Sequence, residues 1–322
     1  MSNILITSAG RRVSLVKYFM EELKKIISSS KVMVVDLDTK LSPAAQIADR
    51  AFNICKIEKD SYVDALIKIC IENNIKLIIP TIDTELIKLS ENIKKFNRNG
   101  IQLVVSDKKI INCCASKLEH EEIFNKLKIK IPQLYSKNDY KLPLFIKPDH
   151  GSSSLNNFII NHETEISRKQ LNNKELLFFE YIEKADYDEY TCDLYYDKTS
   201  VLKCVIPRKR IATRAGEVSK GVTKKNKLVD FLKIKGSKIE GFRGCITIQC
   251  FMHKITEDVI GIEINPRFGG GFPLSYLAGG NYPKWIIQEY LLGEEIPAYN
   301  DWQENLLMLR YDDEILVHDY RD

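Results

Sequence analysis

The sequence contains no long uninterrupted run of hydrophobic residues. A helix needs about 20 apolar residues in succession to cross a bilayer, and the 322 residues contain no such run. The amino-terminal segment also has the wrong order for a secretory signal, because apolar residues 4–6 precede the charges of Arg11 and Arg12. We therefore expect a cytoplasmic protein without a membrane partner.

The eight cysteines lack a metal-binding spacing. They stand at positions 55, 70, 113, 114, 192, 204, 245 and 250. None of them forms the CxxC pair that is typical of zinc sites. Most lie inside apolar runs, which favours buried free thiols in a reducing compartment.

The sequence also lacks a strong net charge and a Walker A loop. Its 48 Lys and Arg residues nearly balance 44 Asp and Glu residues, and the net charge of +4 gives no indication of a nucleic-acid partner. The nearest approach to a Walker A motif runs from Gly216 to Gly221, but Val222 stands where lysine is required. With 44% hydrophobic residues, the composition is that of a folded globular protein.

Apolar strands alternate with amphipathic helices over the first hundred residues. Strands that are apolar throughout and separated by helices are typical of a parallel sheet covered on both faces. We expect an α/β domain over residues 1–110. The predicted strands are residues 3–7, 31–36, 76–80 and 101–105, and the predicted helices are residues 13–27, 62–71 and 83–96.

The pattern changes after Ser116 to α+β, with strands that have antiparallel neighbours. A helix over residues 116–127 comes first, and a lysine-rich helix over 225–235 interrupts the strands. A further helix over 282–292 and a hairpin around Asp312 and Asp313 are expected to end the chain. The predicted strands are residues 142–147, 156–161, 176–181, 189–196, 200–207, 245–252 and 259–265.

Oxygen-bearing side chains gather on one face of the last two long strands. A hairpin centred near residue 256 places Gln249 opposite Glu263, and Thr247 opposite Asn265. This face then combines one carboxylate with two side-chain amide oxygens, which are ligands that magnesium prefers. The sequence predicts a magnesium site formed by Gln249, Glu263 and Asn265.

Arg267 follows this face and is separated from Asn265 by Pro266. A guanidinium beside a metal-bound polyphosphate would stabilise a phosphoryl group during its transfer. Three glycines at positions 269–271 allow a ligand to approach the backbone closely. The alternative is a polar hairpin with a glycine-rich turn, and the combination of Arg267 with the glycines favours the functional interpretation.

Two further segments have the composition of a nucleotide site. Lys147 ends an apolar strand and precedes a loop of small polar residues, as in loops that cradle phosphate. A second strand ends at Glu180, and with Ile182 it would form a flat apolar slot with hydrogen-bonding edges, suited to a purine. A solvated turn and an ordinary strand end are the alternative interpretations.

Candidate substrate residues lie at strand ends. Arg11 follows the first strand, and Asp83 and Glu85 follow a later one, where ligands of parallel sheets gather. We expect Arg11 or Arg12 to hold a carboxylate, and Asp83 and Glu85 to hold an ammonium or amino-acid group, although capping of a helix explains Asp83 equally well. Arg208 and Arg210 are candidate anion ligands, with a solvated charge run as the alternative.

The order of these segments resembles the ATP-grasp superfamily, most closely its carbamoyl-phosphate-synthase large-subunit-like members and carboxylate–amine ligases. The specific element is the hexapeptide from Ile262 to Arg267, and the segment from Phe179 to Ile182 stands in the family's order. The resemblance implies a pre-ATP-grasp domain over residues 1–110, a small subdomain over 111–185 and a large subdomain with a carboxyl-terminal hairpin over 186–322.

The resemblance also implies roles for individual residues. Gln249, Glu263 and Asn265 would hold Mg²⁺, with Mn²⁺ as an alternative ion, and Arg267 would meet the γ-phosphate. Many relatives carry an acid at the position of Gln249, so one of two metal sites is expected to be weak or lost. The implied nucleotide ligands are Lys117, Lys147, Gly151, Ser152, Ser153 and Ser154 for the phosphates, Glu180, Tyr181 and Ile182 for adenine, and Glu189 for ribose.

The implied activity is that of an ADP-forming ligase, which activates a small-molecule carboxylate as an acyl phosphate and joins it to an amine. A kinase step on bicarbonate or carbamate, as in carbamoyl-phosphate synthase, is an alternative from the same superfamily. A sensor that binds ATP without catalysis is the other alternative. The resemblance further implies a homodimer.

Overall fold

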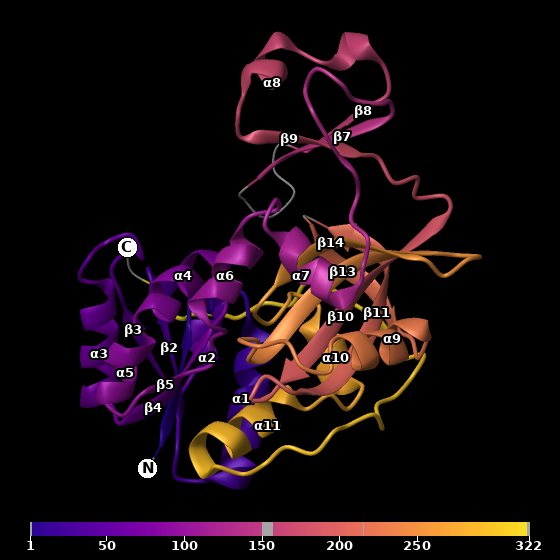
Figure 1. Cartoon of the computed structure of the whole chain (residues 1–322). Coiled ribbons are helices and arrows are strands. Elements are labelled where there is room, and N and C mark those ends of the chain that lie inside the picture. Colours follow the sequence, from indigo (N-terminus) through magenta and orange to yellow (C-terminus); the bar gives the residue numbers. More distant parts are fainter. Residues whose placement is uncertain (1, 150–156, 215, 321–322) are drawn as a thin grey trace.

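The computed structural model describes residues 2–149, 157–214 and 216–320. Its amino-terminal part is a parallel sheet with strand order β3-β2-β1-β4-β5 (Figure 1). The central strand β1 is buried along its whole length. The strands are β1 (Asn3–Thr7), β2 (Val32–Asp36), β3 (Arg50–Asn53), β4 (Ile75–Pro80) and β5 (Gln102–Leu103). The helices are α1 (Val13–Ile26), α2 (Pro43–Ile47), α3 (Tyr62–Glu72), α4 (Asp83–Glu91) and α5 (Ile93–Arg98), with a 3₁₀ turn η1 (Thr39–Leu41).

Side-chain alternation along β1 explains why this sheet is covered on both faces. Ile4 and Ile6 belong to the core that contains α1, whereas Leu5 points into a second core with α3, α4 and α5. Both faces are therefore apolar, as the continuous hydrophobic strands predict.

A larger antiparallel sheet has the strand order β14-β13-β10-β11-β12-β15. Side chains of α6, α7 and α9 pack in the core on one of its faces, and those of α10 and α11 pack on the other. The strands are β10 (Tyr187–Tyr196), β11 (Leu202–Arg214), β12 (Glu217–Thr223), β13 (Gly244–His253), β14 (Val259–Asn265) and β15 (Leu307–Leu309). The helices are α6 (Lys108–Ala115), α7 (His120–Leu127), α9 (Lys227–Lys235), α10 (Phe272–Leu277) and α11 (Tyr282–Ile287), followed by the π-helical turn η3 (Gln288–Leu292).

A small antiparallel sheet of order β6-β9-β7-β8 projects from the rest of the molecule (Figure 1). It has its own core, which includes Leu144, Ile146 and Phe178. Its elements are β6 (Leu134–Tyr135), β7 (Leu144–Pro148), β8 (Phe158–Ile160), β9 (Leu176–Glu180), α8 (Arg168–Asn172) and a 3₁₀ turn η2 (Glu163–Glu165).

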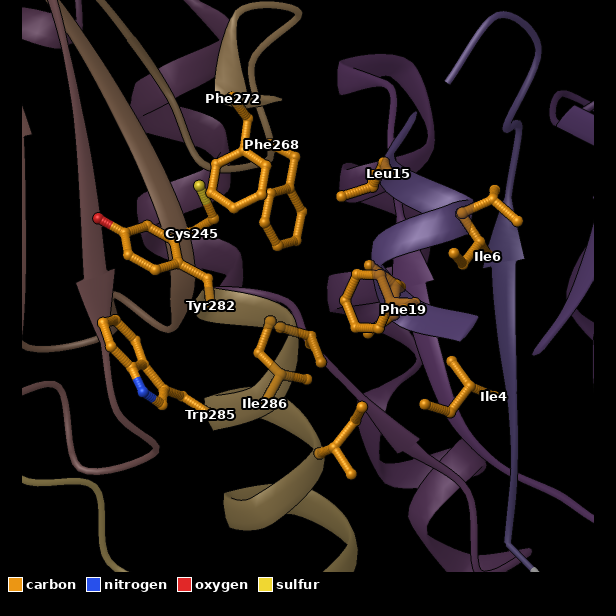
Figure 2. Close-up of a cluster of buried hydrophobic side chains, with 14 of the residues drawn as sticks. Ile4, Ile6, Leu15, Phe19, Cys245, Phe268, Phe272, Tyr282, Trp285 and Ile286 are labelled. Atoms are coloured by element: carbon orange, nitrogen blue, oxygen red, sulfur yellow. The ribbon is translucent and has the colours of Figure 1, made fainter. Parts of the chain in front are cut away.

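The parallel-sheet domain and the large antiparallel sheet share one hydrophobic core. Figure 2 shows Phe19 of α1 opposite Phe268 and Phe272, and the Phe19 and Phe268 ring centroids lie 6.0 Å apart. Tyr282 and Trp285 of α11 stack in the same cluster, with ring centroids 5.2 Å apart. Since these side chains come from both ends of the chain, the two parts form one packed body.

The structure confirms the predicted fold class, a parallel α/β domain followed by α+β subdomains. The single helix expected over 83–96 is instead two helices, α4 and α5, which meet at Asn92. The hairpin expected around Asp312 and Asp313 is wrong. Within the described residues the chain after β15 forms no strand, and β15 pairs with β12 instead.

The proposed domain boundaries stay a prediction. The side chains of α6 and α7 pack in the core of the large sheet, although the predicted boundary at residue 110 cuts α6 and assigns α7 to the small subdomain. Among the described residues, no helix has both the length and the apolar composition that are needed to cross a membrane.

Candidate functional site

The register of the β13–β14 hairpin places the predicted metal ligands together. Gln249 pairs with Glu263, and Thr247 pairs with Asn265, as the sequence predicts. Glu263 is half-buried, and among the described residues its carboxylate has neither a hydrogen bond nor an ion pair. The carboxylate thus remains available to a ligand.

The chemistry of this donor set fits magnesium. Glu263 supplies one carboxylate, and Gln249 and Asn265 supply neutral amide oxygens, so phosphate oxygens of a substrate would complete the shell. Among the described residues, no group of three His, Cys, Asp or Glu side chains is arranged to hold a metal. The role of these three residues as metal ligands stays a prediction.

Lys147 and Lys117 lie at the phosphate side of the proposed site. Lys147, on β7, is 9% exposed, and its ammonium nitrogen lies 4.7 Å from the Phe179 ring centroid. Burial, followed by the positive charge of Lys117, lowers the pKa of Lys147 to about 8. Burial also lowers the pKa of Lys117, while the charge of Glu263 acts in the opposite direction on both lysines.

Asp149 positions Lys117, a role that the sequence did not indicate. Its Oδ1 accepts hydrogen bonds from the backbone N–H of Lys117 at 2.8 Å and from Ser116 Oγ at 3.1 Å. The ammonium of Lys117 donates to the carbonyl oxygen of Asp149 at 2.8 Å. The turn before α7 is therefore attached to the end of β7, next to Lys147.

The predicted phosphate loop lies outside the described residues. It comprises Gly151, Ser152, Ser153 and Ser154, with His150 beside it. Its contribution to the site stays a prediction.

The predicted adenine and ribose ligands lie where the small sheet joins the large one. Glu180, at the end of β9, is exposed, and its Oε2 accepts a hydrogen bond from the Gln133 N–H at 3.2 Å. Tyr181 is half-buried and Ile182 is buried. Glu189, on β10, lies 3.3 Å from the Nε of Arg210.

Arg267 is paired with Asp83 of the parallel-sheet domain. Its Nε donates to Asp83 Oδ1 at 2.8 Å, its Nη2 donates to Oδ2, and Nη2 also donates to Asn265 Oδ1 at 3.3 Å. Burial acts to lower the pKa of Arg267, but the charge and hydrogen bonds of Asp83 outweigh it, so the pKa is raised. Arg267 therefore remains a cation beside Glu263.

Two of the predicted substrate residues are buried inside the protein. Glu85 is fully buried and accepts hydrogen bonds from Thr7 at 2.7 Å, from Ser8 at 3.2 Å and from Tyr62. Burial raises the pKa of Glu85, although these bonds act in the opposite direction. The expectation that its carboxylate contacts a substrate is corrected, because these bonds attach it to the ends of β1 and α3.

The prediction that Arg208 is a substrate ligand is also wrong. It is 1% exposed and bonds to Asp193 through Nε at 2.8 Å and Nη2 at 3.0 Å. Asp193 also accepts from Ser275 Oγ at 2.5 Å. Arg210 donates to the Gly216 carbonyl at 3.0 Å.

A cavity of about 690 Å³ lies between the β1–α1 loop and the large sheet. Arg11 lines it, as do Phe268, Gly269 and Gly270. Several of its charged residues could not be placed there from the sequence, since they come from segments far apart in the chain. These additional lining residues include Lys17, Lys40, Arg214, Glu217, Arg310 and Asp312.

A parallel-sheet domain followed by a small and a large antiparallel sheet is the architecture of the ATP-grasp fold class. Residues 4–104 match the family model described as "PylC-like, N-terminal domain". Residues 172–313 match the model described as "ATP-grasp in the biosynthetic pathway with Ter operon". Residues 172–313 therefore contain an ATP-grasp domain, which confirms the resemblance seen in the sequence.

Solved structures share this fold at low sequence identity. Pyruvate carboxylase from Rhizobium etli matches with a TM-score of 0.73 and 15% identity over 95% of this chain, which spans only 32% of that enzyme. Biotin carboxylase from Campylobacter jejuni matches with a TM-score of 0.73 and 16% identity, covering 95% of this chain and 74% of that one. N5-carboxyaminoimidazole synthetase from Staphylococcus aureus matches with a TM-score of 0.71 and 16% identity, covering 92% and 78%. No curated protein sequence matches the chain.

Proposed function

We propose that this protein is an ATP-dependent, ADP-forming carboxylate–amine ligase. The observation that carries the proposal is the placement of the unpaired Glu263 carboxylate opposite Gln249, with the cations Lys147 and Arg267 electrostatically coupled to it. Such a set binds and neutralises a triphosphate. The ATP-grasp domain match supports the same class of activity.

In the proposed reaction, an oxygen of the substrate carboxylate attacks the γ-phosphorus of ATP, and ADP leaves. The amine nitrogen then attacks the acyl carbon of the acyl phosphate, phosphate leaves with the bonding electron pair, and the nitrogen loses a proton. A carboxylate is already ionised at neutral pH, so the first step needs no general base. Positioning and charge stabilisation are therefore the contributions of the protein.

The described residues have distinct proposed roles. Lys117 and Lys147 would offset the negative charge of the phosphates, and Arg267 would stabilise the transferred phosphoryl group. Glu263, with the amides of Gln249 and Asn265, would hold magnesium, which supplies positive charge beside the triphosphate.

The similar structures support ATP and magnesium as ligands. The biotin carboxylase domain of 2-oxoglutarate carboxylase from Hydrogenobacter thermophilus is a dimer in complex with MgADP, ADP and bicarbonate. The Staphylococcus aureus synthetase is a complex with ADP. These complexes also favour a small-molecule acid as substrate, and the dimer supports the expectation of a homodimer.

ADP release tests the proposal. The wild type should release ADP when Mg-ATP is combined with a suitable pair from a panel of acids and amines, and Glu263→Ala should reduce the rate at least 100-fold. The matched control is Glu240→Ala, which removes an exposed carboxylate elsewhere and should leave the rate unchanged. Binding of Mg-ATP without turnover under any pairing would contradict the ligase and favour a sensor.

A kinase step on bicarbonate is the second candidate, favoured by the similarity to a biotin carboxylase complex that contains bicarbonate. ADP release that needs bicarbonate alone, with no acid and no amine, would establish this candidate in place of the ligase.

A further inference from the structure

The 690 Å³ cavity begins next to the proposed catalytic centre. Ile82 and Phe268, which line it, are the chain neighbours of Asp83 and Arg267. From there it runs along the β1–α1 loop to α2, where Pro43 and Gln46 line it. Its size is that of a small-molecule binding site and far exceeds the volume of bicarbonate.

Four of the ten charged residues that line the cavity are paired with each other. Arg214 bonds to Asp312 through Nη1 at 2.9 Å, and Arg310 bonds to Glu217 at 3.0 Å. The remaining acids of the lining, Asp313 and Glu314, are exposed at the carboxyl-terminal segment. These pairs leave the charge of the β1–α1 loop unbalanced.

The β1–α1 loop and the start of α1 contribute cations that form no ion pair. Among the described residues these are Arg11 and Arg12 of the loop and Lys17 of α1, and Arg12 is half-buried. Burial, followed by the charge of Arg267, lowers the pKa of Arg12, and the negative charges of Glu217 and Asp83 offset this lowering only in part. Arg12 and Arg267 therefore repel each other. A bound anion would relieve this repulsion and satisfy the donors of Arg12.

Helix α1 adds to the positive potential at the same place. It is 14 residues long, begins directly after Arg12, and has neither a side-chain cap nor an acidic residue in its first turn. The free N–H groups and the dipole of a helix start favour an anion. The cavity has room for a small molecule, and the unpaired side chains together with the helix start favour an anionic one.

We propose that this cavity binds a second anionic group of the substrate acid, a carboxylate or a phosphate, with Arg12 as its main side-chain ligand. The inference rests on the proposed ligase function, in which the first carboxylate of the acid reacts beside Arg267. A substrate with only one negative charge would leave Arg12 without an ion pair in a half-buried site. The preferred acid is therefore at least a dianion.

Calorimetric titration in the presence of Mg-ADP tests this inference without turnover. The probes are two matched pairs, glutarate against butyrate and 3-phosphoglycerate against glycerate, which also separate a carboxylate from a phosphate as the second group. At least one dianion should bind tenfold more tightly than its partner. Arg12→Gln should abolish this preference and Arg12→Lys should retain most of it, while Mg-ADP binding reports that each variant is folded.

The control variant is Lys24→Gln, which removes an exposed charge from the same helix outside the cavity and should keep the preference. Equal affinities within both pairs, or a preference that persists in Arg12→Gln, would overturn the inference. Failure of the ligase function itself would appear separately, as the absence of ADP release and of any effect of Glu263→Ala.

Discussion

Asp83 and Arg267 form a doubly hydrogen-bonded ion pair between residues 184 positions apart in the chain. Asp83 begins α4 in the parallel-sheet domain, and Arg267 follows the last strand of the proposed metal-binding hairpin. The pair therefore attaches the amino-terminal domain to the proposed catalytic centre. It also keeps the guanidinium in place next to Asn265 before a phosphate arrives.

A double-mutant cycle on this pair should reveal a stabilising coupling. The side chains of Arg267 and Asp83 are 14% and 37% exposed, so solvent screens the pair only in part. We expect a coupling in the free energy of unfolding of about 1–2 kcal/mol, between the values of surface and buried pairs. Urea unfolding of Asp83→Ala, Arg267→Ala and the double variant measures it, and additive effects would show that the pair contributes nothing.

The affinity of the protein for Mg-ATP should fall as the pH rises from 7.5 to 9.5. With a pKa of about 8, Lys147 is mostly charged at pH 7.5 and mostly neutral at pH 9.5. We expect a loss of about tenfold in affinity over this range, since the neutral amine attracts phosphate less strongly. Calorimetry on Lys147→Met should give a flatter profile, whereas the exposed control Lys174→Met should keep the wild-type slope.

The same lowered pKa has an opposite consequence for folding stability. In the unfolded chain Lys147 keeps its proton up to about pH 10.4, whereas in the fold it loses the proton near pH 8. Between these values the unfolded state binds more protons, so the stability contributed by this group rises with pH. Denaturation curves at pH 8 and pH 10 measure the free energy of unfolding at each pH. The increase that Lys147 contributes between these two values should be absent in Lys147→Met.

Gly261→Ala should destabilise the hairpin through a clash with Phe124. A Cβ at position 261 would stand 2.6 Å from the ring carbon Cζ of Phe124, with two other ring carbons still nearer. The ring is 1% exposed and has little room to move, so we expect a loss of about 1–3 kcal/mol in the free energy of unfolding.

Phe124→Leu should recover part of this loss. The smaller side chain opens space for the new methyl group, so the double variant should be more stable than the sum of the two single effects predicts. Urea unfolding of the four proteins measures the interaction. Strict additivity would show that Phe124 does not exclude a side chain at position 261.

Gln249→Glu should strengthen metal binding and lower the stability of the metal-free protein. The new carboxylate would stand directly across the hairpin from Glu263, where like charges repel. We expect a lower melting temperature without magnesium, and a rise on adding magnesium that exceeds the rise in the wild type. Gln303→Glu is the control for added charge, and an equal magnesium response in both variants would contradict a metal site at Glu263.

Local periodicity predicted much of the fold and of the hairpin. The strand ends around the turn at residue 256 determine which residues face each other, so Gln249 and Glu263 could be paired from spacing alone. The contacts of Asp149 with Lys117 and of Arg310 with Glu217 could not be predicted in this way. They join segments that are far apart in the chain, and the Arg310–Glu217 contact follows from the pairing of β15 with β12.

The sequence also did not reveal which charged side chains are buried. The sequence placed Glu85 and Arg208 at strand ends, where ligand-binding residues gather, but each side chain turns inward to another side chain of the protein, and Arg208 lies within β11. A lone charge at a strand end does not reveal whether its counterion is a substrate or another side chain.

The common core around Phe19, Phe268 and Trp285 restricts how this chain can be divided. Expression of residues 1–110 as a fragment would leave one face of α1 bare, and such a fragment should aggregate unless the remainder is produced with it. Exchange of the amino-terminal domain between proteins of this fold would require the matching aromatic residues from the rest of the chain to be transplanted as well.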